Sequence, residues 1–537
     1  MSEIALVIEG MTCADCARHV RHGLEEAGAQ SVVVDWRAGT GTIAADGPSL
    51  EAMNRALADT RYRVRSAVER GGQTAVPDGG DIPDADYDYD LIVLGSGGGA
   101  FAGAIRARDL GKSVLMVEAH TIGGTCVNVG CIPSKSLLVS SLHHDGADPG
   151  ALAQAVSVKA EIVERLRQEK YVDLIDEYGI ELRRGTAQLS GPHSVTIGEA
   201  SVTAARILIA TGARPQIPEI PGLAEAGYLT STTALELTDV PRRLAVIGAN
   251  AVGLELGQML GNFGSQVTFI SRRALTPRSE PEISEAIRRV LEGQGHTVLE
   301  HASTRRVRPG TDAKMLEVEV GSERIEVEVD AILVAAGRRP NTEQLNLAAV
   351  GVVTDTHGAI VVDDAQRTSV SSIYAAGDVT TQPQFVYVAA AGGAAAAENA
   401  LTGAGRHLDL TNLPQIIFTS PQIALAGLTE QQAREAGFVV QTSVLPLSAI
   451  PRAIVNGDTD GLFKLVADAG SGRLLGASII ADAAGEVIQS AVLAIKAEMT
   501  FTDLASTWAP YLTMAEGLKL AAQTFGRDVA KLSCCAA

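Results

Sequence analysis

The hydrophobic pattern of residues 1–70 predicts one compact α+β unit. Residues 16–27 repeat apolar positions at helical spacing, and so do the residues after Ser49, which can cap a helix N-terminus. Four short apolar runs are expected to be strands, at 4–8, 31–35, 40–44 and 63–68. Residues 71–88 break the pattern with glycine, proline and aspartate, which predicts a flexible acidic linker.

From residue 89 onward the pattern changes to an apolar strand, a glycine-rich loop and a helix, and it occurs twice. The first copy is expected to place a strand, a helix and a strand at 90–94, 100–110 and 114–118. The second copy is expected to place them at 243–247, 254–263 and 267–270. Residues after about 411 have no third glycine loop and form a separate α+β unit. The sequence therefore predicts an α/β protein with two Rossmann-like nucleotide-binding domains.

Composition excludes several classes of partner. The formal net charge of the 537 residues is -19, which argues against binding to nucleic acid or to an anionic membrane. No apolar run reaches the roughly 18 residues of a membrane span, and no basic start precedes an apolar run as in a signal peptide. We therefore expect a cytoplasmic protein.

All six cysteines fall into three close pairs. In a cytoplasmic protein, such pairs are more often catalytic or metal-binding than structural. Three pairs along one chain indicate either a thiophilic cargo that passes between sulfurs or a relay of thiol redox steps. The pairs are Cys13 and Cys16, Cys126 and Cys131, and Cys534 and Cys535.

The first glycine loop follows a predicted strand and opens a predicted helix. Its glycines allow a tight turn and a close approach of the backbone to a pyrophosphate, and the helix N-terminus favours the phosphate charge. Glu118, at the end of the next strand, can accept a hydrogen bond from a ribose hydroxyl. The expected nucleotide-binding residues of the loop are Gly95, Gly97, Gly98, Gly99 and Ala100.

The second glycine loop runs from Gly248 to Gly253, with Asn250 at its central glycine position. The strand that follows ends in Arg272 and Arg273, without an acidic residue for a ribose hydroxyl. Two arginines can pair with a 2′-phosphate, so this loop favours NADPH over NADH.

Cys126 and Cys131 follow Gly124 and Thr125, and Lys135 lies one helical turn beyond them. A helix start and a nearby lysine both stabilise a thiolate, so we expect lowered pKa values for both thiols. The pair comes directly after the first nucleotide-binding unit, where it could exchange two electrons with a flavin ring.

The segment Gly-Gly-Thr-Cys-Val-Asn-Val-Gly-Cys-Ile-Pro-Ser-Lys resembles the redox-active segment of the pyridine nucleotide–disulfide oxidoreductases. The resemblance covers residues 89 to 537 and implies FAD as a second cofactor. It also implies that Asp378 approaches the ribityl chain of FAD, and that Lys135 pairs with Glu255 beside the flavin ring. Ala251 stands where many members have a tyrosine that shields the flavin. Further flavin-domain residues implied by the resemblance are Ala210, Thr211 and Gly212.

The C-terminal unit departs from the disulfide reductases of this family. Those enzymes use a histidine base there, whereas the last histidine of this chain is His407. Tyr511 and Glu516 stand in the corresponding segment. Adjacent Cα atoms are about 3.8 Å apart, too close for an unstrained disulfide, so Cys534 and Cys535 are better suited to capturing a soft cation.

Cys13 and Cys16 lie in a Gly-Met-Thr-Cys-Ala-Asp-Cys loop between a predicted strand and helix. A Cys-x-x-Cys pair alone also occurs in thioredoxin-like redox proteins, but the unit of residues 1–70 is too short for that fold. It resembles the heavy-metal-associated domain, which implies a small ferredoxin-like α+β fold that binds metal.

Over its whole length the chain resembles the branch of the oxidoreductase family that reduces Hg(II) to Hg(0). The resemblance implies that Cys131 is the thiolate next to the flavin, that Cys126 exchanges ligands, and that Tyr171 and Tyr511 assist at the metal. It further implies a homodimer in which Cys534 and Cys535 take Hg(II) from its thiol complexes and serve the partner's site.

The domains expected from this resemblance are a metal-binding domain at 1–70, an FAD domain at 89–240 and 341–410, an NADPH domain at 241–340 and a dimerisation domain at 411–537. Two alternatives remain at this point: a reductase of an organic disulfide, and a metal carrier without catalysis.

Overall fold

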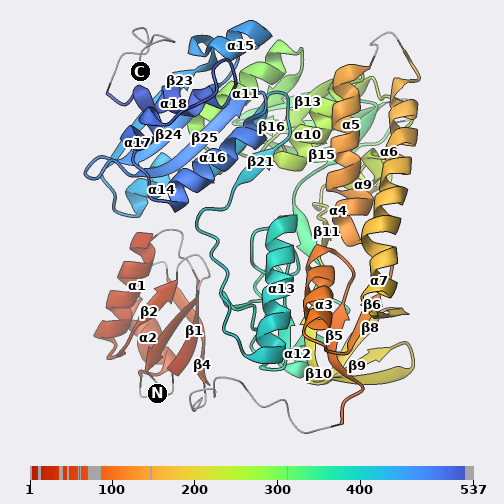
Figure 1. The fold of residues 1–537 in the computed structure, drawn as a ribbon, viewed down its shortest axis with the longest axis vertical. Coiled ribbons are helices and arrows are strands. Elements are labelled where there is room, and N and C mark those ends of the chain that lie inside the picture. Colours follow the sequence, from red (N-terminus) through yellow and green to blue (C-terminus); the bar gives the residue numbers. More distant parts are fainter. Residues whose placement is uncertain are drawn as a thin grey trace. The chain divides into compact units, whose positions relative to one another are not determined.

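The computed structural model describes residues 3–9, 14–35, 40–44, 47–58, 60, 62–70, 86–144, 148–310 and 313–526 (Figure 1). The chain divides into two compact units, Met1–Gly80 with Glu430–Val440 and Asp81–Thr429 with Gln441–Ala537. Residues 71–85 of the linker expected at 71–88, the expected metal ligand Cys13 and the pair Cys534 and Cys535 lie outside the described residues. Cys16 lies in a helix, but its side chain is also outside the description.

The N-terminal unit is a four-stranded antiparallel sheet with two helices. The sheet order is β2-β3-β1-β4, and the Ser49 hydroxyl accepts a hydrogen bond from the amide of Ala52, as expected for a helix cap. The core of the unit consists of side chains between Ile4 and Val64. The elements are β1 (Glu3–Glu9), α1 (Ala14–Glu26), β2 (Val33–Asp35), β3 (Thr40–Ala44), α2 (Leu50–Ala56) and β4 (Arg63–Arg70).

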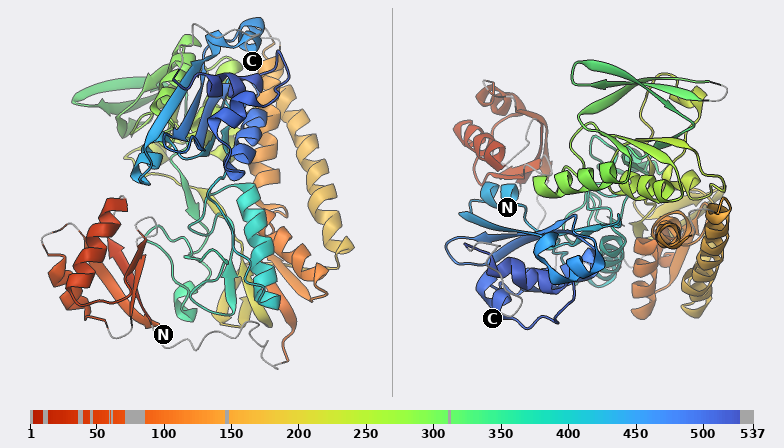
Figure 2. Two further views of the ribbon diagram at one scale, coloured as in Figure 1. Left: turned by 60° about the vertical axis from the view of Figure 1, so that its left-hand side comes forward. Right: turned by 90° about the horizontal axis from the view of Figure 1, so that it is seen from above.

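The first nucleotide-binding domain is built on a parallel sheet in the order β7-β6-β5-β10, with β20 beside β10. Helix α13 lies against α3 on one face of this sheet, as both ribbon views show (Figure 1, Figure 2). Its strands are β5 (Tyr89–Leu94), β6 (Val114–Glu118), β7 (Glu181–Arg184), β8 (Ala187–Gly191), β9 (Ser194–Ile197), β10 (Ala200–Ile209), β11 (Ala213–Pro215), β19 (Arg338–Pro340) and β20 (Ile373–Ala375).

The helices of this domain cover the sheet and carry the cysteine segment. A single π-helical turn, η1, interrupts the long helical arm between α6 and α7. The helices are α3 (Gly98–Asp109), α4 (Gly124–Val129), α5 (Cys131–His143), α6 (Ala151–Arg167), η1 (Gln168–Val172), α7 (Asp173–Glu177), α8 (Leu223–Ala226), α9 (Ser231–Ala234), α12 (Leu347–Val350) and α13 (Val386–Thr402).

The second nucleotide-binding domain has a parallel sheet in the order β14-β13-β12-β18 and a three-stranded antiparallel sheet. Helices α3 and α10 begin two and three residues before the predicted starts, because the glycine and alanine residues of their first turns carry no apolar periodicity. The elements are β12 (Arg243–Ile247), α10 (Ala251–Asn262), β13 (Gln266–Ile270), α11 (Pro281–Gly293), β14 (Thr297–Leu299), β15 (Ala302–Arg308), β16 (Lys314–Val320), β17 (Glu323–Val329) and β18 (Ala331–Val334).

The C-terminal segment forms a five-stranded sheet in the order β21-β22-β25-β24-β23. Among the described residues, no helix combines the length and apolar character that crossing a membrane requires. The strands are β21 (Gln415–Ile417), β22 (Gln422–Gly427), β23 (Val440–Pro446), β24 (Leu462–Asp468) and β25 (Leu474–Ala481). The helices are α14 (Glu430–Glu435), the 3-10 turn η2 (Leu447–Ala449), α15 (Pro451–Asn456), α16 (Ala484–Lys496), α17 (Phe501–Ser506) and α18 (Glu516–Gln523).

Candidate active site

The first glycine loop joins β5 to α3 and lies directly against the cysteine segment. Gly95 has a φ of 107°, and a Cβ there would lie 2.5 Å from the carbonyl oxygen of Ala210, so only glycine fits. A Cβ on Gly124 would lie 2.6 Å from the Cα of Gly97, which places the start of α4 against the loop. Glu118 is buried and accepts hydrogen bonds from the Ser96 hydroxyl and the His120 amide. The loop thus holds an open helix N-terminus and a fixed carboxylate at the ends of neighbouring parallel strands.

The two cysteines face each other across the break between α4 and α5. Cys126 lies within α4, and Cys131 is the first residue of α5. Both thiols are free, and a hydrogen bond joins their sulfur atoms. The Cys131 side chain is exposed and that of Cys126 is half-buried, so solvent exposure does not assign their roles. In this arrangement the two sulfur atoms can take part in a two-electron transfer, and they can also bind one ion together.

The expectation of a lowered pKa for both thiols is wrong for Cys126. The pKa of Cys131 is lowered, first by the hydrogen bond from Cys126 and also by the positive charge of Lys135. The pKa of Cys126 is raised, because it donates that hydrogen bond, is partly buried and lies beside the charge of Cys131. Neighbouring groups of like charge resist ionising together, so one thiolate forms at the expense of the other.

Lys135 and Glu255 form an ion pair between the two nucleotide-binding domains. Their Nζ and Oε2 atoms are 2.7 Å apart, and the Glu255 side chain is only 8% exposed. Lys135 lies one turn after Cys131 on α5, and Glu255 lies on α10. The pair therefore fixes a positive charge close to the cysteines and ties the two domains together at that point.

Tyr171 lies on the π-helical turn η1, near enough to Cys126 and Cys131 for their charges to act on its hydroxyl. Its ring packs edge-on against Phe101 with 4.8 Å between the ring centroids. Burial raises the pKa of Tyr171, and the negative charges of Cys126 and Cys131 raise it further. At neutral pH the phenol therefore keeps its proton and can donate a hydrogen bond toward the sulfur atoms or a ligand on them.

Tyr511 lies apart from this cluster in the exposed segment between α17 and α18, and its side chain is 62% exposed. No contact among the described residues joins it to Cys126 or Cys131 within one chain. Among these residues there is also no group of three or more histidine, cysteine, aspartate or glutamate side chains that could hold a metal ion.

Arg338 is a residue of the site that the sequence analysis did not identify. Its Nε atom lies 3.4 Å from the carboxylate of Asp378, and its Nη2 atom donates to the carbonyl oxygen of Ala213 and, at 3.5 Å, to the Thr125 hydroxyl. Burial raises the pKa of Asp378, and the charge of Arg338 opposes this rise. Arg338 begins β19, four residues after the parallel strand β18 ends at Val334, and its place beyond the carboxyl end of a predicted parallel strand is the sequence feature that could have identified it.

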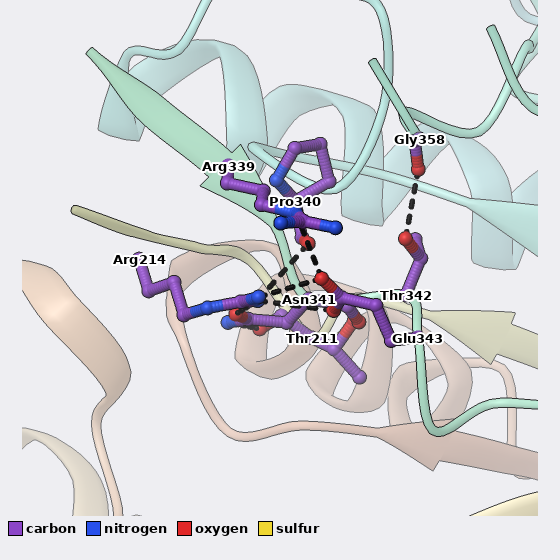
Figure 3. A network of polar contacts seen from close by, with 8 residues as sticks. All are labelled: Thr211, Arg214, Arg339, Pro340, Asn341, Thr342, Glu343 and Gly358. Atoms are coloured by element: carbon purple, nitrogen blue, oxygen red, sulfur yellow. Dashed lines mark hydrogen bonds and ion pairs between the residues drawn. The ribbon is translucent and has the colours of Figure 1, made fainter. Parts of the chain in front are cut away.

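The residues after Arg338 fasten the segment 210–212 in place (Figure 3). The Thr211 hydroxyl donates to the carbonyl of Asn341 at 2.9 Å, and the Asn341 side-chain amide donates back to the carbonyl of Thr211 at 2.9 Å. Arg214 donates to the Asn341 side chain and to both carboxylate oxygens of Glu343. These hydrogen bonds hold the segment 210–212, in which the carbonyl of Ala210 lies against Gly95.

The second glycine loop is also formed as a close turn. A Cβ on Gly253 would lie 1.9 Å from the carbonyl oxygen of Gly248, so the first turn of α10 can approach the loop only with glycine there. Asn250 precedes α10 without capping it through its side chain. Arg272 and Arg273 follow β13 and are exposed, which leaves both guanidinium groups open to a ligand at the end of the strand.

Comparison with known proteins agrees with this geometry. Residues 89–393 match the profile of the pyridine nucleotide-disulphide oxidoreductases, residues 413–522 match the dimerisation domain of these enzymes, and residues 6–63 match the heavy-metal-associated domain. The chain belongs to the pyridine nucleotide-disulphide oxidoreductase family, and the expected combination of folds is confirmed. A dimerisation domain of this kind indicates a homodimer.

Within this family the chain groups with the mercuric reductases. It is 47% identical to the mercuric reductase of Bacillus cereus, over 100% of this chain and 87% of the relative. It is 46% identical to that of Staphylococcus aureus, over 98% of each chain. Among solved structures, the HOCl-induced flavoprotein disulfide reductase RclA of Escherichia coli is similar, with a TM-score of 0.75 and 31% identity over 81% of this chain and 99% of that chain.

Proposed function

We propose that this protein reduces Hg(II) to Hg(0) with electrons from NADPH, using FAD and the pair Cys126 and Cys131. A hydride from NADPH carries two electrons, Hg(II) accepts both, and one proton is released as NADP⁺ forms. The observation that supports this most is the thiol pair itself, which adjoins the glycine loop and has Lys135 one turn away. Purified enzyme should therefore oxidise NADPH only when Hg(II) is added and release one Hg(0) for each NADPH. NADPH oxidation without Hg(0) release would refute the proposal.

The residues of the first domain fit FAD. Gly95 leaves room for a pyrophosphate at the N-terminus of α3, and Glu118 is fixed at the end of β6. The Nε of Arg338 is buried without a hydrogen bond, and it lies 3.4 Å from the half-buried carboxylate of Asp378. When bound, FAD would supply two-electron transfer between the nicotinamide and the thiols.

The two thiols would have different roles because their pKa values differ. Cys131, with the lowered pKa, would be the thiolate beside the flavin, and Cys126 would exchange ligands with incoming Hg(II). Thiolates are the preferred ligands of soft cations, so the ion stays bound to sulfur throughout. Tyr171, whose raised pKa keeps it protonated, would stabilise the thiolate ligands through a hydrogen bond.

Two further cysteine pairs would deliver the ion. Cys13 and Cys16 would capture Hg(II) from its thiol complexes in the cytoplasm, and Cys534 and Cys535 would pass it to the active site of the partner subunit. Tyr511, exposed on the dimerisation domain, would act at that same site across the dimer. Organic disulfides are a less suitable substrate, since the residues after His407 contain no histidine to act as the base.

The two arginines after β13 should determine the choice of cofactor. Replacing Arg272 and Arg273 with glutamine is expected to raise the KM for NADPH and to leave the use of NADH little changed. Loss of two charge-assisted hydrogen bonds to a 2′-phosphate corresponds to about 2–4 kcal/mol. Steady-state kinetics with both cofactors measures this, and an unchanged preference for NADPH would show that other residues bind the phosphate.

Removal of residues 1–80 should leave a folded and active reductase. Among the described residues, the hydrophobic core of the N-terminal unit consists of side chains between Ile4 and Val64. The residues of the proposed active site all lie beyond the deletion. The truncated enzyme should reduce Hg(II) more slowly than the full-length enzyme mainly when free thiols are scarce, because it lacks Cys13 and Cys16 to capture the ion. Loss of FAD, or of turnover with thiol-bound Hg(II) at ample thiol, would contradict this independence.

A further inference from the structure

The segment 418–420, between β21 and β22, reaches the ion pair of Lys135 and Glu255 from a third domain. The backbone amide of Phe418 donates to Oε1 of Glu255 at 3.0 Å, while Oε2 of Glu255 binds Lys135 at 2.7 Å. The Phe418 ring lies with its centroid 4.5 Å from the Lys135 ammonium. One residue of the dimerisation domain therefore contacts both members of the pair.

Gln258, one turn after Glu255 on α10, anchors this segment. Its Oε1 accepts from the Ser420 amide at 2.7 Å, and its Nε2 donates to the Ser420 carbonyl at 2.8 Å. The same Nε2 also donates to Gln294 at 3.0 Å. Gln258 is 0% exposed, so each of these hydrogen bonds is made away from water, where an unmet partner is costly.

The contacts form one continuous connection. Glu255 and Gln258 lie three positions apart on α10 and hold the two ends of the segment 418–420. A carboxylate with each oxygen bound to a different donor has a single orientation, and a ring beside an ammonium further restricts the lysine. Lys135 therefore has one position, set jointly by three domains.

We propose that Phe418 and Gln258 are positioning residues that hold the Lys135 ammonium at the electron-transfer site. This inference rests on the proposed function, in which Lys135 lies beside the flavin and the thiolate. A fixed ammonium stabilises the negative charge that develops at this site on reduction, and a mobile one is solvated by water instead. The dimerisation domain thereby contributes to electron transfer within its own subunit.

The test uses the full-length enzyme loaded with FAD and three variants. Phe418→Leu removes the ring and keeps the backbone amide, Phe418→Tyr keeps the ring, and Gln258→Met removes the anchor at nearly constant length. Phe418→Leu and Gln258→Met are expected to slow flavin reduction by NADPH roughly fivefold to thirtyfold. Both should shift the flavin midpoint potential to more negative values, whereas Phe418→Tyr should keep the wild-type rate and potential.

Hydrogen exchange tests the connection without catalysis. In Gln258→Met, backbone amides of the peptide 415–421 should exchange roughly tenfold faster than in wild type, since two buried hydrogen bonds are lost. Phe463→Leu is a matched control, because Phe463 is fully buried in β24 and belongs to the hydrophobic core of the same domain. It should lower the melting temperature and leave the flavin potential and the exchange of 415–421 unchanged.

Two outcomes separate this inference from the proposed function. If Lys135→Met slows flavin reduction but Phe418→Leu and Gln258→Met match wild type and Phe463→Leu, the positioning role is overturned and the function stands. If Lys135→Met leaves flavin reduction unchanged, the role proposed for the ion pair itself fails.

Discussion

Replacing Cys131 or Cys126 with alanine is expected to abolish Hg(II) reduction while FAD stays bound. The loss should be on the order of a thousandfold or more, because the two thiols act as one unit in binding and reducing the ion. FAD should remain, since its expected contacts come from Gly95, Glu118 and Asp378, whose positions do not depend on the sulfurs. Release of Hg(0) and the flavin absorbance of the purified variants measure both effects.

The two variants should differ in one spectroscopic property. The lowered pKa of Cys131 makes it the thiolate of the pair in the reduced enzyme. The long-wavelength absorbance that a thiolate produces beside an oxidised flavin should therefore disappear in Cys131→Ala and persist in Cys126→Ala. The opposite absorbance pattern would show that Cys126 is the thiolate beside the flavin. Substantial Hg(II) reduction by either variant would show that the pair is not required for the reaction.

Replacing Cys534 and Cys535 together with alanine is expected to impair turnover of Hg(II) held by bulky thiols, on the order of tenfold to a hundredfold. We expect bulky complexes to be hindered at the half-buried Cys126, whereas Cys534 and Cys535 would take the ion from them and pass it to the inner pair. Hg(II) with small ligands should be reduced at nearly the wild-type rate. Equal turnover of bulky complexes with and without these cysteines would exclude a delivery role.

Mixed dimers test where this delivery occurs. Combining the Cys534 and Cys535 variant with a Cys126 and Cys131 double variant should restore part of the activity if each terminus serves the partner's site. Only one of the two sites in such a dimer has both an intact inner pair and an intact terminal pair from its partner. If the mixed dimers stay inactive while the other results are as expected, the terminal cysteines deliver the ion to the active site of their own subunit.

The sequence predicts best those parts of the fold that a local pattern determines. Strands 114–118 and 243–247 agree with β6 and β12 to the residue, because a parallel strand buried on both faces is a continuous apolar run. The glycine loops could be placed because Gly95 and Gly253 each meet a backbone atom that no side chain could approach. The starts of α3 and α10 could not be placed as well, since small residues carry no periodicity.

The pKa values of Cys126 and Cys131 depend on a geometry that their spacing in the sequence does not specify. The sequence places a lysine one turn after Cys131, which lowers a thiol pKa, but it does not show that the two sulfurs share a hydrogen bond. That contact separates the two pKa values in opposite directions. The packing of Tyr171 on Phe101 could not be predicted either. Tyr171 lies on the π-helical turn η1, and no residue pattern in the sequence predicts that turn.

Contacts between residues far apart in the sequence were the least predictable part of the site. Arg338 reaches Asp378, and Phe418 reaches Glu255, across 40 and 163 positions of sequence respectively. Neither arginine nor phenylalanine belongs to a motif with a recognised spacing to its partner. Only the folding of the chain brings each of these residues to its partner.

The most direct test of the account is a comparison of substrates for NADPH oxidation by the purified enzyme. Hg(II) with excess thiol, oxidised glutathione and oxidised lipoamide should be supplied separately at equal concentrations, with Hg(0) vapour collected in each case. We predict rapid NADPH oxidation with one Hg(0) per NADPH for Hg(II), and little oxidation with either disulfide, because the residues after His407 contain no histidine base. Faster turnover of a disulfide than of Hg(II) would contradict the account and identify the enzyme as a disulfide reductase.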